Sequence, residues 1–252
     1  METRPPAVME DLRARIRAIE RPLRPGRGAL PFGIAAIDRV LPGGGLARGA
    51  LHEVAGGGIG ATHAAAAALF SAGVLARAPG QVLWCVTRAD LFAPALEQAG
   101  LSADRVIYVE AGDDQALLGC FEEGLRCGAL AGVVAEVARL PMVVSRRLQL
   151  AAESSGIIGI ALRRWRRPAD AADFGQPTAS VTRWRVSALP SAPLPAPGVG
   201  RARWFVELIR CRAGESADFM VEACDETGCL AVPAELADGS AAPAFGGSRA
   251  AG

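Results

Sequence analysis

Short apolar runs alternate with longer stretches of helical periodicity across residues 30–162, and this alternation constrains the fold more than any other feature. The apolar runs span residues 50–55, 81–87, 105–109, 132–137 and 156–162. Helical stretches separate them at residues 61–78, 90–99, 113–127 and 141–155. Strands that are apolar throughout are buried on both faces. The sequence therefore predicts an α/β fold with a core of parallel strands flanked by helices.

The pattern changes after residue 162. Residues 179–187 and 203–212 alternate polar and apolar side chains, as half-exposed strands do, and we expect them to pair antiparallel. A last strand is expected at 219–223. This gives five parts: an N-terminal amphipathic helix and linker (1–29), the core (30–188), a proline-rich loop (189–200), C-terminal strands (201–237) and a disordered tail (238–252).

The N-terminal part places Val8, Leu12, Ile16 and Ile19 at helical spacing, which predicts an amphipathic helix over 7–21. No apolar run reaches the roughly 18 residues that cross a bilayer, and no signal-peptide pattern is seen. We therefore expect a cytoplasmic protein without a membrane contact, associated with the nucleoid when active. The six cysteines form no CxxC pair, and reduced thiols are favoured over a metal site.

A glycine-rich segment follows the first long apolar run and precedes a helical stretch. A strand, a glycine-rich turn and a helix N-terminus form the architecture of a phosphate-binding loop, because backbone N–H groups and the helix dipole point at an anion there. The candidate loop residues are Gly56, Gly57, Gly58, Gly60, Ala61 and Thr62.

The catalytic part of such a loop is missing. The chain contains no lysine, and Ala61 stands where the phosphate-binding lysine belongs. The loop is also one residue short, although Thr62 could still hold Mg²⁺. The run at 132–137 offers Glu136 as the acidic residue of a second nucleotide motif, or as a surface residue. Without positioned positive charge, ATP hydrolysis is not expected. We expect no cofactor, with bound ATP and Mg²⁺ as the alternative to a scaffold role.

The segment before the loop resembles a known family. Residues 30–49, LPFGIAAIDRVLPGGGLARG, are similar to the start of the RecA core, and a short chain with a degraded phosphate loop resembles ImuA, a RecA- and SulA-related mutagenesis protein. The resemblance implies a role in SOS-induced mutagenesis. It also implies an ImuB-like inactive Y-family polymerase and an error-prone C-family DNA polymerase as partners, with RecA as a further one.

The overall charge of +1 conceals a basic block over residues 163–212 and an acidic end over 213–252. Arginine and tryptophan adjoin in this block, a combination typical of grooves that bind single-stranded nucleic acid. Contact with a protein partner and a purely structural role remain alternatives. The candidate residues for binding DNA or a partner are Arg163, Arg164, Trp165, Arg166, Arg167, Arg183, Arg185, Arg201 and Arg203.

Three functions are compatible with these features. The first is a non-catalytic RecA-like accessory protein of error-prone translesion DNA synthesis, which bridges polymerase partners and single-stranded DNA. The second is a SulA-like inhibitor of cell division. The third is a weak DNA-dependent ATPase that uses a substitute arginine such as Arg48 or Arg88.

Overall fold

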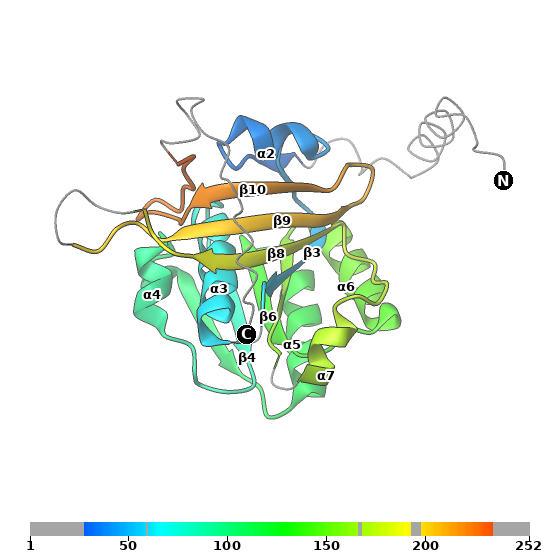
Figure 1. Ribbon diagram of the computed structural model, residues 1–252. Coiled ribbons are helices and arrows are strands. Elements are labelled where there is room, and N and C mark those ends of the chain that lie inside the picture. Colours follow the sequence, from blue (N-terminus) through cyan, green and yellow to red (C-terminus); the bar gives the residue numbers. More distant parts are fainter. Residues whose placement is uncertain (1–27, 59, 166–167, 193–197, 234–252) are drawn as a thin grey trace, which may run out of the picture.

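The computed structural model describes residues 28–58, 60–165, 168–192 and 198–233. The predicted N-terminal helix and the whole of the expected tail lie outside these residues, as do Arg166 and Arg167. Figure 1 shows a twisted sheet with helices on both of its faces. Among the described residues, no helix is long and apolar enough to span a membrane.

The central sheet has eight strands in the order β10-β9-β8-β3-β7-β6-β4-β5. Their bounds are β3 Ala50–Gly56, β4 Val82–Val86, β5 Val106–Glu110, β6 Gly132–Val137, β7 Ile158–Arg163, β8 Thr182–Leu189, β9 Arg203–Cys211 and β10 Ala217–Glu222. The pairs β5–β4, β4–β6, β6–β7, β7–β3 and β3–β8 are parallel, whereas β8–β9 and β9–β10 are antiparallel. The predicted parallel core and antiparallel C-terminal strands are both confirmed.

The helices form two layers (Figure 1). Helix α3 (Ala61–Ala76) packs against β3 and β8 and contacts α4 (Ala93–Gln98), whereas α5 (Asp114–Arg126) and α6 (Met142–Ser155) pack on each other and against β6 and β3. Shorter elements are α2 (Ala35–Val40), α7 (Pro168–Asp173), a 3-10 turn at Ala103–Arg105, and the two-stranded ladder of β1 (Ala29–Leu30) with β2 (Leu46–Ala47).

The core lies on both faces of the sheet, as the uniformly apolar strands predict. Consecutive residues of β4 show this arrangement, because Trp84 belongs to the cluster under α3 and Cys85 belongs to the cluster under α5 and α6. Under α3, the rings of Phe32, Phe70 and Trp184 lie 5.5 to 5.8 Å apart. Segments from three parts of the chain therefore meet in one aromatic cluster, which joins the 30–49 segment to the sheet.

Two features differ from the sequence-based expectation. Strand β8 continues through Leu189, which pairs with Arg203, so the proline-rich connection begins later than residue 189. Helix α4 begins at Ala93 rather than at residue 90, with Pro94 in its first turn. Proline fits the first turn of a helix, because the N–H that it lacks would have no partner there. Neither α2 nor α7 was expected, because a helix of six residues is too short to show a helical period in the sequence.

Candidate functional site

The glycine-rich loop joins β3 to α3, and it is packed closely against its surroundings. A Cβ added to Gly56 would lie 2.8 Å from the carbonyl of His63 in the first turn of α3, and one added to Gly57 would lie 1.7 Å from Ser187 Oγ on β8. Only glycine therefore fits at these two positions. The Gly57 N–H donates to the Val186 carbonyl at 2.8 Å, so the loop continues the hydrogen bonding between β3 and β8.

The first turn of α3 is also fixed to β8. The Ala188 N–H donates to His63 Nδ1 at 3.2 Å, and the His63 ring lies 3.2 Å from where a Cβ on Gly58 would stand. Thr62, the residue that could hold Mg²⁺, is exposed. In a phosphate-binding loop the backbone N–H groups point at the anion. Here the Gly57 N–H donates to a strand of the sheet instead, so it is not available to bind an anion.

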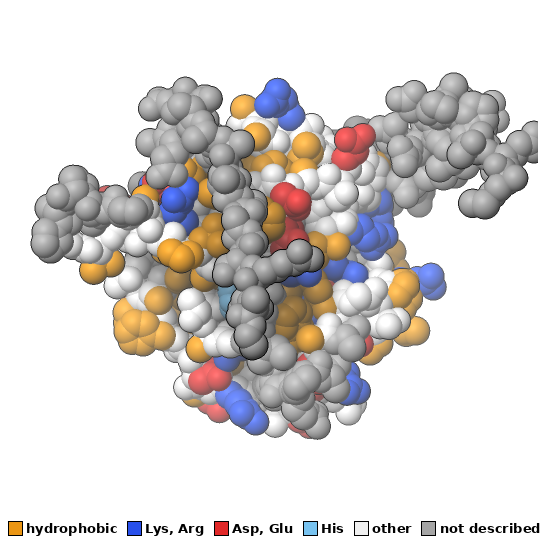
Figure 2. Space-filling view, viewed as in Figure 1, with side chains coloured by type: hydrophobic (Ala, Val, Ile, Leu, Met, Phe, Trp, Pro, Cys, Tyr) orange, Lys and Arg blue, Asp and Glu red, His pale blue; other side chains and the backbone are white. Residues whose placement is uncertain are grey.

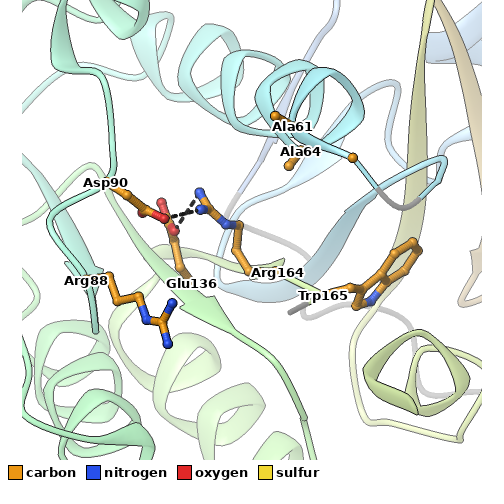
Figure 3. Close-up of a pocket in the computed structure, with 8 residues that line it drawn as sticks. Ala61, Ala64, Arg88, Asp90, Glu136, Arg164 and Trp165 are labelled. Atoms are coloured by element: carbon orange, nitrogen blue, oxygen red, sulfur yellow. Dashed lines mark hydrogen bonds and ion pairs between the residues drawn. The ribbon is translucent and has the colours of Figure 1, made fainter. Parts of the chain in front are cut away.

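A cavity of about 280 Å³ lies beside this loop, at the carboxyl ends of β3, β4, β6 and β7 (Figure 3). This edge of the sheet is where open α/β folds bind their ligands. The cavity is lined by Gly60, Ala61, Ala64, Arg88, Asp90, Glu136, Arg164 and Trp165.

Arg164 occupies the centre of the cavity and joins two carboxylates (Figure 3). Its Nη1 lies 3.0 Å from Glu136 Oε2, and its Nη2 donates to Asp90 Oδ2 at 2.8 Å. Glu136 is only 4% exposed, and Trp84 Nε1 donates to its other oxygen at 3.1 Å. Glu136 is thus a buried, fully engaged carboxylate rather than a surface residue. A guanidinium from the chain itself supplies positive charge to the cavity.

A second charged cluster lies in the interior around Glu53, a fully buried residue of β3. Arg163 Nη1 donates to Glu53 Oε2 at 2.9 Å, and Arg183 Nη2 donates to Oε1 at 3.1 Å. The hydroxyl of Ser180 donates to Oε1 at 2.6 Å, and that of Thr178 also donates to it. A buried carboxylate is tolerated only when it is paired in this way. The cluster ties β3, β7 and β8 together below the cavity.

Comparison with known proteins gives both a family and a fold. No protein-family model matches the chain. It is 40% identical over 234 residues to Protein ImuA of Caulobacter vibrioides, from strains NA1000 / CB15N and ATCC 19089 / CIP 103742 / CB 15. The alignment covers 87% of this chain and 95% of each relative. The chain belongs to the ImuA family.

A solved structure of the RadB recombinase shares the fold of this ImuA-family chain, with a TM-score of 0.55 and 18% sequence identity. The match covers 81% of this chain and 99% of the recombinase chain. Similarity at this level shows the RecA-like architecture alone. The resemblance of residues 30–49 to a RecA core is consistent with it.

The arginines of the basic block lie in different environments in the structure. Arg163 and Arg183 are 2% and 6% exposed and bound to Glu53, so the expectation that they contact DNA or a partner is corrected. The cause is the buried carboxylate, which needs cationic neighbours. In this ImuA-family protein both arginines stabilise the fold.

Three further arginines of the block contact neighbouring groups of the protein. Arg185 is 40% exposed and donates Nε to Glu207 at 2.6 Å, a hydrogen bond that raises the pKa of Arg185. Arg201 donates to the carbonyls of Ala223 and Cys229 at 2.8 and 2.9 Å. Arg203 lies on β9 and donates to Met220 Sδ at 3.3 Å. Figure 2 accordingly shows basic and acidic side chains intermixed on its visible face.

The tryptophans are separated as well. Trp184 and Trp204 are buried in the aromatic cluster under α3, so neither indole can stack on a base. Trp165 is half-buried beside the cavity, with its ring 5.7 Å from that of Phe174. Its Nε1 is buried and has no hydrogen-bond partner among the described residues. Trp165 is thus the one tryptophan of the basic block that borders the cavity.

Glu53 and Asp90 were not predicted as site residues from the sequence. Glu53 had a detectable signal, because His52 and Glu53 interrupt an otherwise apolar strand, and polar residues in such a strand require buried partners. Asp90 gave no signal, since its role depends on Arg164, which lies 74 positions later in the chain. Arg48, suggested as a substitute cation, does not line the cavity, whereas Arg88 does.

Proposed function

We propose that this protein is a non-catalytic RecA-like accessory factor of error-prone translesion DNA synthesis. The observation that carries the proposal is the ion pair of Arg164 with Glu136 inside the cavity beside the glycine-rich loop. Membership of the ImuA family and the RecA-like fold support the link to damage-induced mutagenesis. The function would then reside in surfaces that bind other proteins and DNA rather than in a reaction.

The cavity argues against ATP hydrolysis on chemical grounds. Phosphoryl transfer needs positive charge that is aimed at the phosphates and is free to stabilise the transition state. Here Ala61 replaces the lysine, and Arg164 is already paired with two carboxylates. Glu136, which would help to hold Mg²⁺, is neutralised by the same arginine. A nucleotide would have to displace both ion pairs before it could bind.

The proposed partners are an ImuB-like inactive Y-family polymerase and an error-prone C-family polymerase, with RecA as a further candidate. We place contact with single-stranded DNA at Trp165 and at the adjoining Arg166 and Arg167, because Trp165 borders the cavity while the other tryptophans are buried. Arg164, Arg185, Arg201 and Arg203 are the further candidates for binding a partner.

The DNA contact is tested by titrating the full chain with labelled single-stranded DNA at several salt concentrations. Replacing Arg166 and Arg167 by alanine should weaken binding and lower the salt slope by about one for each phosphate that is no longer neutralised. Replacing Arg126, an exposed arginine on α5, should change neither value. Equal effects in both variants, or no binding by the wild type, would contradict the placement.

The function is tested in cells that lack the gene. Ultraviolet-induced mutation frequency and cell length are measured in the same cultures. The proposal predicts that induced mutations fall to the spontaneous level while division after damage is unchanged. Persisting mutagenesis with altered filamentation would instead indicate a SulA-like inhibitor of cell division.

A further inference from the structure

Helix α6 exposes apolar side chains beside a groove that the proposed function does not use. Val143 and Leu150 are 70% and 64% exposed, and they lie seven residues apart on one side of the helix. The groove has a volume of about 410 Å³ and runs between α6 and the segment before β8. It is lined by Met142, Arg146, Gln149, Leu150, Glu153, Thr178, Ala179 and Arg212.

The charged rim of the groove has two arginines and one carboxylate. Arg146 makes no ion pair with any described residue, and Arg212 donates to the Ala179 carbonyl at 2.9 Å. Glu153 accepts a hydrogen bond from Gln149 at 2.9 Å. A segment that fills this groove should therefore combine an apolar stripe with two acidic residues and one basic residue along its flanks.

Residues 7–20 of the chain offer an apolar stripe with charged side chains on both flanks. Val8, Leu12, Ile16 and Ile19 recur at the spacing of one helix face. On a helix of 3.6 residues per turn, Asp11 and Arg15 flank this stripe on one side, and Arg13 and Glu20 flank it on the other. Asp11 and Arg15 would thus meet Arg146 and Glu153 of α6, and Glu20 would meet Arg212 across the groove.

The chain also reaches the groove from the point where the described structure begins. The Gly28 carbonyl accepts from the Arg48 N–H at 3.3 Å, and the Leu51 N–H donates to Gln149 Oε1, at the groove, at 2.8 Å. Arg48 and Leu51 are three residues apart, a separation of roughly 10 Å. A linker over residues 21–27 spans up to about 25 Å when extended. The path from Gly28 to the groove is therefore short enough.

We propose that residues 7–20 form a helix that lies in the α6 groove of the same molecule, with its apolar stripe on Met142 and Leu150. Asp11 and Glu20 then face Arg146 and Arg212, and Arg15 faces Glu153. Arg17 lies on the opposite side of this helix and stays accessible. The proposal does not depend on the function proposed above.

The test is hydrogen–deuterium exchange of the full-length chain, followed on peptides that cover residues 7–20. Amides of this segment should exchange at least about tenfold faster in Leu150→Asp than in the wild type. Phe92→Asp is the matched control, because Phe92 is 68% exposed and precedes α4, on the other face of the sheet, and exchange should not change. Full exchange of the segment in the wild type, or equal rates in all three proteins, would overturn the proposal.

Reversing the charges of the proposed Arg146–Asp11 pair provides an independent check, because Arg146 is exposed and its replacement does not disturb the core. Arg146→Glu should speed exchange of residues 7–20, and adding Asp11→Arg should restore the slow rate. Failure of this rescue would contradict the proposed register. Protection that rises with protein concentration would show that a second copy fills the groove, which would overturn the intramolecular arrangement.

Discussion

Arg164 Nη1 lies 3.0 Å from Glu136 Oε2, within the cavity that adjoins the glycine-rich loop. This pair links the end of β7 to the end of β6. Arg164 Nη2 also donates to Asp90, which links both strands to the loop after β4. The strand ends that surround a nucleotide in a RecA-like ATPase are thus held together here by side chains of the protein. The pair thus joins β6 and β7 at this edge of the sheet.

Replacement of Arg164 by methionine should destabilise the protein by about 2 kcal/mol, because Glu136 would stay buried without its charged partner. The midpoint of urea unfolding measures this change. Asp90→Asn is the control, since Asp90 is 52% exposed and its loss should cost less than about 1 kcal/mol. Adding Glu136→Gln to the Arg164 variant should recover part of the loss. A neutral single variant would show that the pair does not stabilise the fold.

Replacement of Glu53 by glutamine should have a larger effect, a loss of about 3–5 kcal/mol, because two buried arginines would lose their carboxylate. Unfolding by urea at neutral pH again gives the value. Glu207→Gln removes the partner of the half-exposed Arg185 and serves as the comparison, with an expected loss below about 1 kcal/mol. Similar losses in the two variants would contradict the assignment of Arg163 and Arg183 to a structural role.

The stability of the protein should fall as the pH falls from about 6.5 to about 4, in part because of His52. Burial lowers the pKa of His52 from 6.5 to about 4, although its hydrogen bond with the Ala47 carbonyl acts in the opposite direction. The unfolded chain therefore binds a proton in this window and the folded chain does not. At pH 5 this difference amounts to about 2 kcal/mol.

The His52 contribution is isolated by unfolding the wild type and His52→Gln at about pH 7.5 and about pH 5. The wild type should lose about 2 kcal/mol more than the variant over this interval. Equal losses would show that His52 is not the group that titrates. The carboxylates that titrate in both proteins cancel in the comparison.

The cysteines should differ strongly in reactivity. Burial raises the pKa of Cys85 and of Cys224 to about 12, so neither forms a thiolate near neutral pH. Cys127 is exposed at the end of α5. A thiol reagent at about pH 8 should label Cys127 in the folded protein and should reach Cys85 and Cys224 only after unfolding. Mass spectrometry of the labelled peptides identifies the sites, and early labelling of Cys85 would contradict its burial.

The strands of the core could be predicted because their signal is local. An apolar run such as residues 132–137 must be buried on both faces, whichever segments pack against it. The structure places β6 at those residues. The strand, glycine turn and helix around Gly56 were predictable for the same reason.

The roles of the arginines were not predictable from local sequence. Arg163 and Arg164 are adjacent, yet one is bound to Glu53 in the interior and the other lies in the cavity with Glu136. Alternation at the end of β7 places them on different sides, and the partner of Arg163 stands 110 positions earlier in the chain. The cluster of arginines in the sequence predicted a basic surface. In the fold, some of these arginines lie in the interior and others lie outside it.

The central proposal is that the cavity beside the glycine-rich loop does not bind ATP, because Arg164 is paired there with Glu136 and Asp90. Binding of ATP tests it most directly. Titration calorimetry of the full chain with ATP and Mg²⁺ should show no binding up to about 1 mM, with or without single-stranded DNA. Binding of one ATP per chain that is lost in Thr62→Ala would contradict the claim, because it would show that the glycine-rich loop still holds a nucleotide.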